Sequence, residues 1–237
     1  MKNILEIKNL SKKLGKKEVL KNVSFSVGEG EIYGFLGPNG AGKTTTMKNI
    51  LRFMNPDSGE IKIFSKNVLD EEVKKQIGFM PENTYLYKHL TGKEFLKFNG
   101  KFFGLFGQKL DQKVQNLLKK LGLENAGDKF LKDYSKGMLQ RIGLAQAIIN
   151  DPKLLFLDEP MSGLDPIGRK MVKDLIVELN NKGTTIFFNT HILADVESIC
   201  DKISIIHNGE IIVESKKVSD IKGHLEDFFI ESVSQKN

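Results

Sequence analysis

The sequence predicts an α/β protein with a strand-rich N-terminal region and an inserted helical lobe. Two apolar runs, residues 32–36 and 153–157, show no polar alternation, as expected for parallel strands buried on both faces. A helical pattern follows each run, whereas residues 91–121 show helical periodicity without an intervening strand. We therefore expect a mixed sheet covered by helices, with a helical segment inserted between its strands.

The composition is that of an ordinary globular protein. The 237 residues are 40% hydrophobic and 28% charged, without a membrane-length apolar run, and the first residues do not resemble a signal peptide. The single cysteine, Cys200, excludes an internal disulfide and is expected to pack in the core. The net charge of +6 is scattered, so we expect no nucleic-acid partner. A local lysine cluster is expected to be a solvated face, compatible with a weak attraction to anionic membranes: Lys12, Lys13, Lys16 and Lys17.

Strand patterns dominate the first part of the chain. Residues 24–27 and 60–63 alternate cleanly between polar and apolar, and residues 1–70 are strand-rich as a whole. A turn at residues 55–59 closes the helix expected over residues 44–53. We expect the strands to form an N-terminal antiparallel β subdomain.

A glycine-rich segment, Gly-Pro-Asn-Gly-Ala-Gly-Lys-Thr-Thr, follows the first buried strand. Within it, Gly37, Gly42, Lys43 and Thr44 fit the P-loop pattern G-x-x-x-x-G-K-[ST]. Glycines let backbone N–H groups wrap a polyphosphate, the lysine supplies a cation, and the threonine hydroxyl can ligate Mg²⁺. The sequence thus predicts a P-loop NTPase core that binds a nucleotide and Mg²⁺ through Gly37, Pro38, Asn39, Gly40, Ala41, Gly42, Lys43, Thr44 and Thr45.

The inserted lobe is expected over residues 81–134. Thr91 and Glu94 form a capping box that starts a phenylalanine-rich helix. From Asp111 onward, leucines and a valine fall on one helical face, and Gly122 ends this second helix.

Polar residues end two of the predicted buried strands. Asp158 can hold the Mg²⁺ shell, and the adjacent Glu159 can polarise water for attack on the γ-phosphate. Two acids at a strand end can equally be solvated surface residues. His191 follows the strand expected at residues 184–188, where a lone histidine is more often structural than functional.

Helix caps and a hairpin organise the remaining chain. Ser135 is expected to cap a helix that reaches about Asn150, and Asp165 to cap one that ends before Gly183. The Asn-Gly pair at 208–209 predicts a β-hairpin. The last six residues, 232–237, are expected to be frayed.

Together and in this order, the segments resemble the nucleotide-binding subunit of ATP-binding cassette (ABC) transporters. The resemblance covers about residues 1–230. Residues 134–138 stand at the place of the family's signature motif, residues 162–165 resemble its D-loop, and His191 resembles its switch histidine. The variant pattern and the chain ending are similar to those of bacterial drug-resistance, lantibiotic-immunity and sodium-efflux exporters.

The resemblance implies one ABC-type ATPase domain over residues 1–237. Its RecA-like core, with the β subdomain, would comprise residues 1–80 and 135–230, and the helical lobe residues 81–134.

The resemblance also implies a head-to-tail homodimer, or a pair with another ABC subunit, that closes on two ATP molecules. Each ATP would lie between the P-loop of one subunit and the signature residues Ser135 and Gly137 of the other. Lys43, Glu159 and His191 would be catalytic. Closure would be transmitted to integral membrane permease subunits through the cleft between core and lobe.

Several positions depart from the family pattern. Leu14 replaces the aromatic residue that stacks on adenine, with Val19 on the same side, so we expect loose base selectivity. Glu82 occupies the position of the Q-loop glutamine and could contact Mg²⁺ or water. In the signature, Lys136 and Met138 are departures, and the cation of Lys136 could offset Glu82 near the partner's phosphate.

The leading hypothesis is an ATPase that drives solute movement, with export favoured by the resemblance, from the cytoplasmic face of the cell membrane. One alternative is a soluble ABC ATPase that moves no solute, such as a cluster-assembly factor. Another is a nucleotide sensor without turnover, against which the Asp158, Glu159 and His191 set argues.

Overall fold

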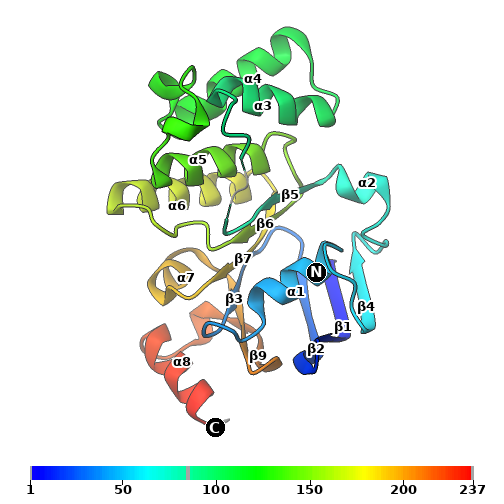
Figure 1. Cartoon of the computed structure of the whole chain (residues 1–237). Helices are drawn as coiled ribbons and strands as arrows, with labels where there is room; N and C mark the ends of the chain where they lie inside the picture. Colours follow the sequence, from blue (N-terminus) through cyan, green and yellow to red (C-terminus); the bar gives the residue numbers. More distant parts are fainter. Residues whose placement is uncertain (1, 84–85, 236–237) are drawn as a thin grey trace.

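A small antiparallel sheet forms one side of the molecule (Figure 1). The computed structural model describes residues 2–83 and 86–235. The sheet has the strand order β2-β1-β4 and confirms the predicted N-terminal β subdomain. Its strands are β1 (Asn3–Leu14), β2 (Lys17–Gly28) and β4 (Ser58–Ile63).

The larger sheet has the order β5-β6-β7-β3-β8-β9 and is mixed, as predicted. Its first five strands run parallel, and β9 pairs antiparallel with β8. Both residues of the predicted hairpin turn, Asn208 and Gly209, have the positive φ (47° and 81°) that the tightest hairpins need. The strands are β3 (Ile32–Leu36), β5 (Ile77–Met80), β6 (Leu154–Asp158), β7 (Thr185–Thr190), β8 (Lys202–His207) and β9 (Glu210–Lys217).

The central strands separate two hydrophobic cores. On one face of β3, Tyr33 and Phe35 pack against Phe187, with ring centroids 5.9 and 5.4 Å away, in the core shared with the small sheet. On the other face, Ile32 and Leu36 belong to the core beneath the helices. Alternate side chains therefore enter different cores, which is why these strands are apolar at successive positions.

Helices cover the larger sheet and extend beyond it (Figure 1). The helix α1 contributes to the core with the small sheet, whereas α5, α6 and α7 pack into the second core. The pair α3 and α4 lies beyond α5 at one end of the molecule. Both helices fall within residues 81–134, which we propose form the helical lobe. The helices are α1 (Lys43–Ile50), α2 (Glu71–Lys74), α3 (Gly92–Phe102), α4 (Gly107–Lys120), α5 (Lys136–Ala147), α6 (Pro166–Asn181), α7 (Leu193–Ile199) and α8 (Leu225–Ser234).

The predicted helix caps agree with the structure. Thr91 and Glu94 make both hydrogen bonds of a capping box, and Ser135 accepts a hydrogen bond from the backbone N–H of Met138. Asp165 caps α6 through the N–H of Gly168 at 2.7 Å. Cys200 is buried in the second core, as expected.

Several boundaries were predicted wrongly, four of them in helices, and β7 ends at Thr190, two residues beyond the strand expected at residues 184–188. The helix α4 begins at Gly107 and not at Asp111, because burial of Leu110 adds a turn. The tail expected to fray from Ser232 belongs to α8 up to Ser234, because Leu225 is buried and anchors this helix. The helices α1 and α5 each end three residues early, at Ile50 and Ala147.

In the described part of the chain, no helix is long and apolar enough to cross a membrane.

Candidate functional site

The P-loop connects the end of β3 to the start of α1. Gly40 and Gly42 have φ of 80° and 115°, a left-handed conformation that side chains disfavour. A Cβ on Gly37 would lie 2.4 Å from the backbone oxygen of Ile206, so only glycine fits between the loop and β8. These conformations shape the loop around the N-terminus of α1, as the motif predicts.

Lys43 is buried against its own loop. Its ammonium group donates hydrogen bonds to the carbonyl oxygens of Gly37 at 2.7 Å and Pro38 at 3.3 Å. Burial lowers the pKa of Lys43, and the charges of Glu159, Asp158 and Glu82 oppose this shift. The lysine is thus a desolvated cation surrounded by three carboxylates, and an anionic ligand would supply the charge that favours its protonated form.

Asp158 joins the sheet edge to the P-loop helix. Its Oδ1 accepts hydrogen bonds from the hydroxyl of Thr44 at 3.3 Å and from the side-chain amide of Asn189 at 3.0 Å. A hydroxyl beside a carboxylate is a donor set that Mg²⁺ accepts. Over residues 2–83 and 86–235, no cluster of three or more His, Cys, Asp or Glu side chains could hold a metal. The pair of Thr44 and Asp158 fits an Mg²⁺ ion that takes its other ligands from phosphate oxygens and water.

The backbone of Glu159 is left-handed, with φ of 50°. Its N–H donates to the carbonyl of Asn189 at 3.0 Å. Its carbonyl accepts hydrogen bonds from the side chain of Gln140 at 3.0 Å and from the N–H of Ser162 at 3.1 Å. Left-handed conformations are unfavourable for residues other than glycine, so these neighbours hold the residue in a strained geometry.

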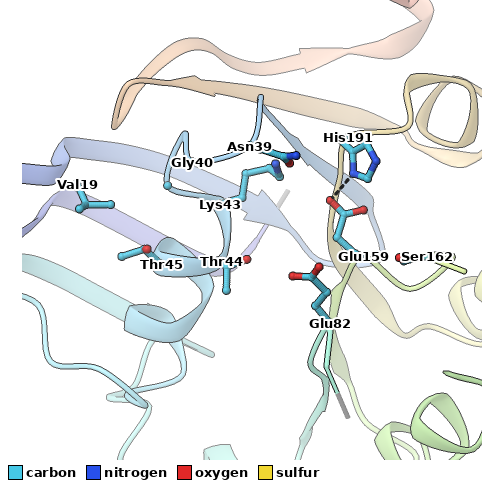
Figure 2. A pocket seen from close by; sticks show the side chains of 11 residues that line it. Val19, Asn39, Gly40, Lys43, Thr44, Thr45, Glu82, Glu159, Ser162 and His191 are labelled. Atoms are coloured by element: carbon cyan, nitrogen blue, oxygen red, sulfur yellow. Dashed lines mark hydrogen bonds and ion pairs between the residues drawn. The ribbon is translucent and has the colours of Figure 1, made fainter. Parts of the chain in front are cut away.

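The side chain of Glu159 contacts the predicted switch histidine (Figure 2). Its Oε1 lies 2.8 Å from Nδ1 of His191, and its Oε2 accepts a 3.4 Å hydrogen bond from the hydroxyl of Thr190. The carboxylate is 9% exposed and the histidine side chain 52% exposed. A buried carboxylate thus faces the opening with a partner that can exchange protons.

These groups converge on a cavity of about 440 Å³. Glu82 enters it from the segment after β5, opposite Lys43 and Thr44 (Figure 2). Eleven residues line it: Val19, Asn39, Gly40, Gly42, Lys43, Thr44, Thr45, Glu82, Glu159, Ser162 and His191.

Other predicted site residues lie outside this lining. Leu14 is 45% exposed at the end of β1. Gly37 and Ala41 are buried beneath the loop, next to the half-buried Pro38, and Asp158 reaches the site through Thr44. Ser135 and Gly137 line a separate pocket of about 410 Å³ together with the D-loop. Lys136 packs there against Gly163, whose added Cβ would lie 2.7 Å from its Cε.

Gln140 and Asn189 were missed by the sequence analysis. Both are buried polar residues within apolar patterns, on α5 and β7 respectively. A buried amide needs a partner, which is a signal of a polar contact, but the sequence does not reveal that the partners are Glu159 and Asp158.

The ABC transporter family matches residues 20–162. The chain belongs to this family. It is 46% identical to an uncharacterized ABC transporter ATP-binding protein of Synechocystis, over 90% of this chain and 60% of that protein. It is 44% identical to the uncharacterized ABC transporter ATP-binding protein YxlF of Bacillus subtilis, over 88% and 69%. It is 38% identical to the bacitracin transport ATP-binding protein BcrA of Bacillus licheniformis, over 90% and 70%.

A solved ATP-binding subunit of an ABC transporter has the same fold, with a TM-score of 0.89, 34% identity and coverage of 97% of this chain and 99% of that one. The predicted family and fold are thereby confirmed, and the chain is an ABC ATP-binding subunit. The chain spans about three fifths of the length of two of its cyanobacterial relatives.

Proposed function

We propose that this ABC subunit hydrolyses ATP and thereby drives solute movement through a separate membrane permease. The observation that carries the proposal is the contact between Glu159 and His191 in the cavity that the P-loop lines. A nucleotide-binding protein without turnover would not need a buried carboxylate and a histidine at this place.

Each residue would have a distinct role. Lys43 and the loop N–H groups would bind the phosphates, while Thr44, Asp158 and Glu82 would hold Mg²⁺, which neutralises phosphate charge when bound. Glu159 would accept a proton from the attacking water, and His191 would orient that carboxylate. In this assignment, Glu159 is the base, and its burial would keep bulk water away from it.

The second pocket supports a dimer. Ser135 and Gly137 open to the surface in a pocket that does not share lining residues with the cavity at Lys43. We therefore propose that a facing copy or a related ABC subunit supplies Ser135 and Gly137 to the nucleotide bound at Lys43. ATP would close this pair and product release would reopen it.

An exposed aromatic surface on the lobe supports a permease partner. Tyr87, Phe98 and Phe102 form a chain of edge-to-face contacts, and Phe102 is 73% exposed. Exposed aromatic clusters are typical of protein interfaces. The permease would place the chain at the cytoplasmic face of the membrane. The similarity to the bacitracin transport protein supports a role in solute transport, and export is proposed on the sequence resemblance.

The Glu159→Gln variant tests this function. We expect it to bind ATP and to dimerise with ATP and Mg²⁺, while hydrolysis falls by about two to four orders of magnitude because the amide cannot accept a proton. Light scattering measures the dimer and phosphate release measures turnover, with Lys43→Ala as the control that loses both. Parent-like hydrolysis by Glu159→Gln would contradict the assigned base. If the chain co-purified from native membranes with a soluble partner and without a multi-span protein, this result would favour a non-transport ABC ATPase.

A further inference from the structure

Two helices carry the loops on either side of Glu159. The helix α6 begins directly after the loop of Ser162, and α7 begins two residues after His191. Both Ser162 and His191 line the cavity. The relative position of α6 and α7 therefore determines how these two loops approach the carboxylate.

A buried ion cluster joins the two helices. The side chain of Asp195 on α7 is only 4% exposed. Its Oδ2 lies 2.7 Å from Nη2 of Arg169, and its Oδ1 lies 3.6 Å from Nζ of Lys173, both on α6. A carboxylate removed from water requires such partners, so these contacts restrain α7 against α6.

The opposite side of α7 is also restrained. Gly34 on β3 has no side chain, and a Cβ there would lie 3.1 Å from Val196 and 3.0 Å from Cys200. The hydroxyl of Thr190 accepts the N–H of Ile192 at 3.1 Å. The seven-residue helix is thus held between β3 and α6, and His191 lies two residues before its start.

We propose that Arg169 and Asp195 are positioning residues that hold His191 against Glu159. They act through α7, and neither side chain lines the cavity at Lys43. Because Arg169 lies on the first turns of α6, four residues after Asp165, the pair also transmits movement of the Ser162 loop to His191. The catalytic consequence rests on the proposed ATPase function, whereas the placement of His191 does not.

The test uses the full chain with Asp195→Asn and Arg169→Gln. We expect each variant to lower kcat between about tenfold and a hundredfold, with an unchanged KM for ATP, because a small displacement misaligns the reacting groups without weakening nucleotide binding. The imidazole NMR signals of His191 should shift in both variants. The chain has four histidines, and His191→Gln assigns the signal. Arg169→Lys keeps the charge and should restore most of the turnover.

A neighbouring ion pair supplies the matched control. Lys170 and Asp174 lie on the same helix at 2.8 Å, but their side chains are exposed. Lys170→Gln and Asp174→Asn should change neither kcat nor the His191 signal. Thermal unfolding confirms that each variant is folded, and Arg169→Gln replaces Asp195→Asn if the latter unfolds.

Parent-like His191 signals in folded Asp195→Asn and Arg169→Gln would overturn the positioning role, whatever their turnover. If the parent chain itself releases no phosphate, the proposed function fails, while the NMR comparison still supports or overturns the placement of His191.

Discussion

At the scale of single residues, amides determine how the carboxylates of the site are presented. Gln140 and Ser162 hold the backbone of Glu159, and Asn189 donates to Asp158. Acidic residues at a strand end are recognisable in the sequence, but their amide partners come from helices and strands distant along the chain. The residue types of the site were therefore predictable, and the hydrogen bonds that orient them were not.

Asn189→Ala should weaken the use of Mg²⁺. The variant removes the 3.0 Å hydrogen bond to Asp158, so the carboxylate is less well oriented toward Thr44. We expect the Mg²⁺ concentration for half-maximal hydrolysis to rise about tenfold, as for other partners of metal ligands. A magnesium titration of phosphate release measures this change.

Asn180→Ala is the control. This amide donates to the backbone oxygens of Gly30 and Thr184, which precede the N-terminal ends of β3 and β7, whereas the site lies at the C-terminal ends of these strands. An unchanged magnesium requirement in Asn189→Ala would show that Asp158 needs no orienting amide.

At the scale of elements, locally encoded features were predicted well. The capping box at Thr91, the cap at Asp165 and the turn at Asn208 each depend on a few adjacent residues. The start of α4 and the extent of α8 depend on the burial of Leu110 and Leu225 by other segments. Tertiary burial therefore determines the boundaries that the sequence pattern placed wrongly.

Thr91→Ala should destabilise the chain by about 1 kcal/mol, because the backbone N–H of Glu94 loses its acceptor. Hydrogen bonds from Thr91 hold the pKa of Glu94 below its usual value. The unfolded chain then binds this proton more readily, so the contribution of the ionised Glu94 is present at neutral pH and decreases on acidification. Urea unfolding at neutral and acidic pH measures both effects.

Thr45→Ala, which leaves the capping box intact, should keep the pH dependence of the parent chain. An identical dependence in Thr91→Ala and the parent would show that the Thr91 hydroxyl does not contribute to it, because the backbone N–H of residue 91 is present in both chains.

At the scale of the whole molecule, the order of the motifs predicted the family and the mixed sheet. It did not predict which side chains join one helix to another. The association of α6 with α7 through Arg169 and Asp195 has no local signature, because charged residues at this spacing are usual on exposed helix faces.

The aromatic surface of the lobe should affect partner binding and not catalysis. The double variant Phe98→Ser/Phe102→Ser removes two exposed rings of this surface. We expect it to retain ATP hydrolysis as an isolated subunit and to lose co-purification of a multi-span membrane protein, because the apolar contact area is reduced. Phe53→Ser, an exposed ring that packs on Phe79 instead, is the control. Undiminished co-purification of the double variant would place the permease on another surface.

The left-handed backbone of Glu159 creates a trade-off between the stability of the fold and ATP hydrolysis. Asparagine adopts this conformation more readily than glutamine, and both lack the carboxylate. The Glu159→Asn variant should therefore melt at a higher temperature than Glu159→Gln in differential scanning calorimetry, although ATP hydrolysis would be strongly reduced in both. Equal melting temperatures would show that the turn is relaxed. A more stable but inactive form of this protein is thus one substitution away, at the residue proposed as the base.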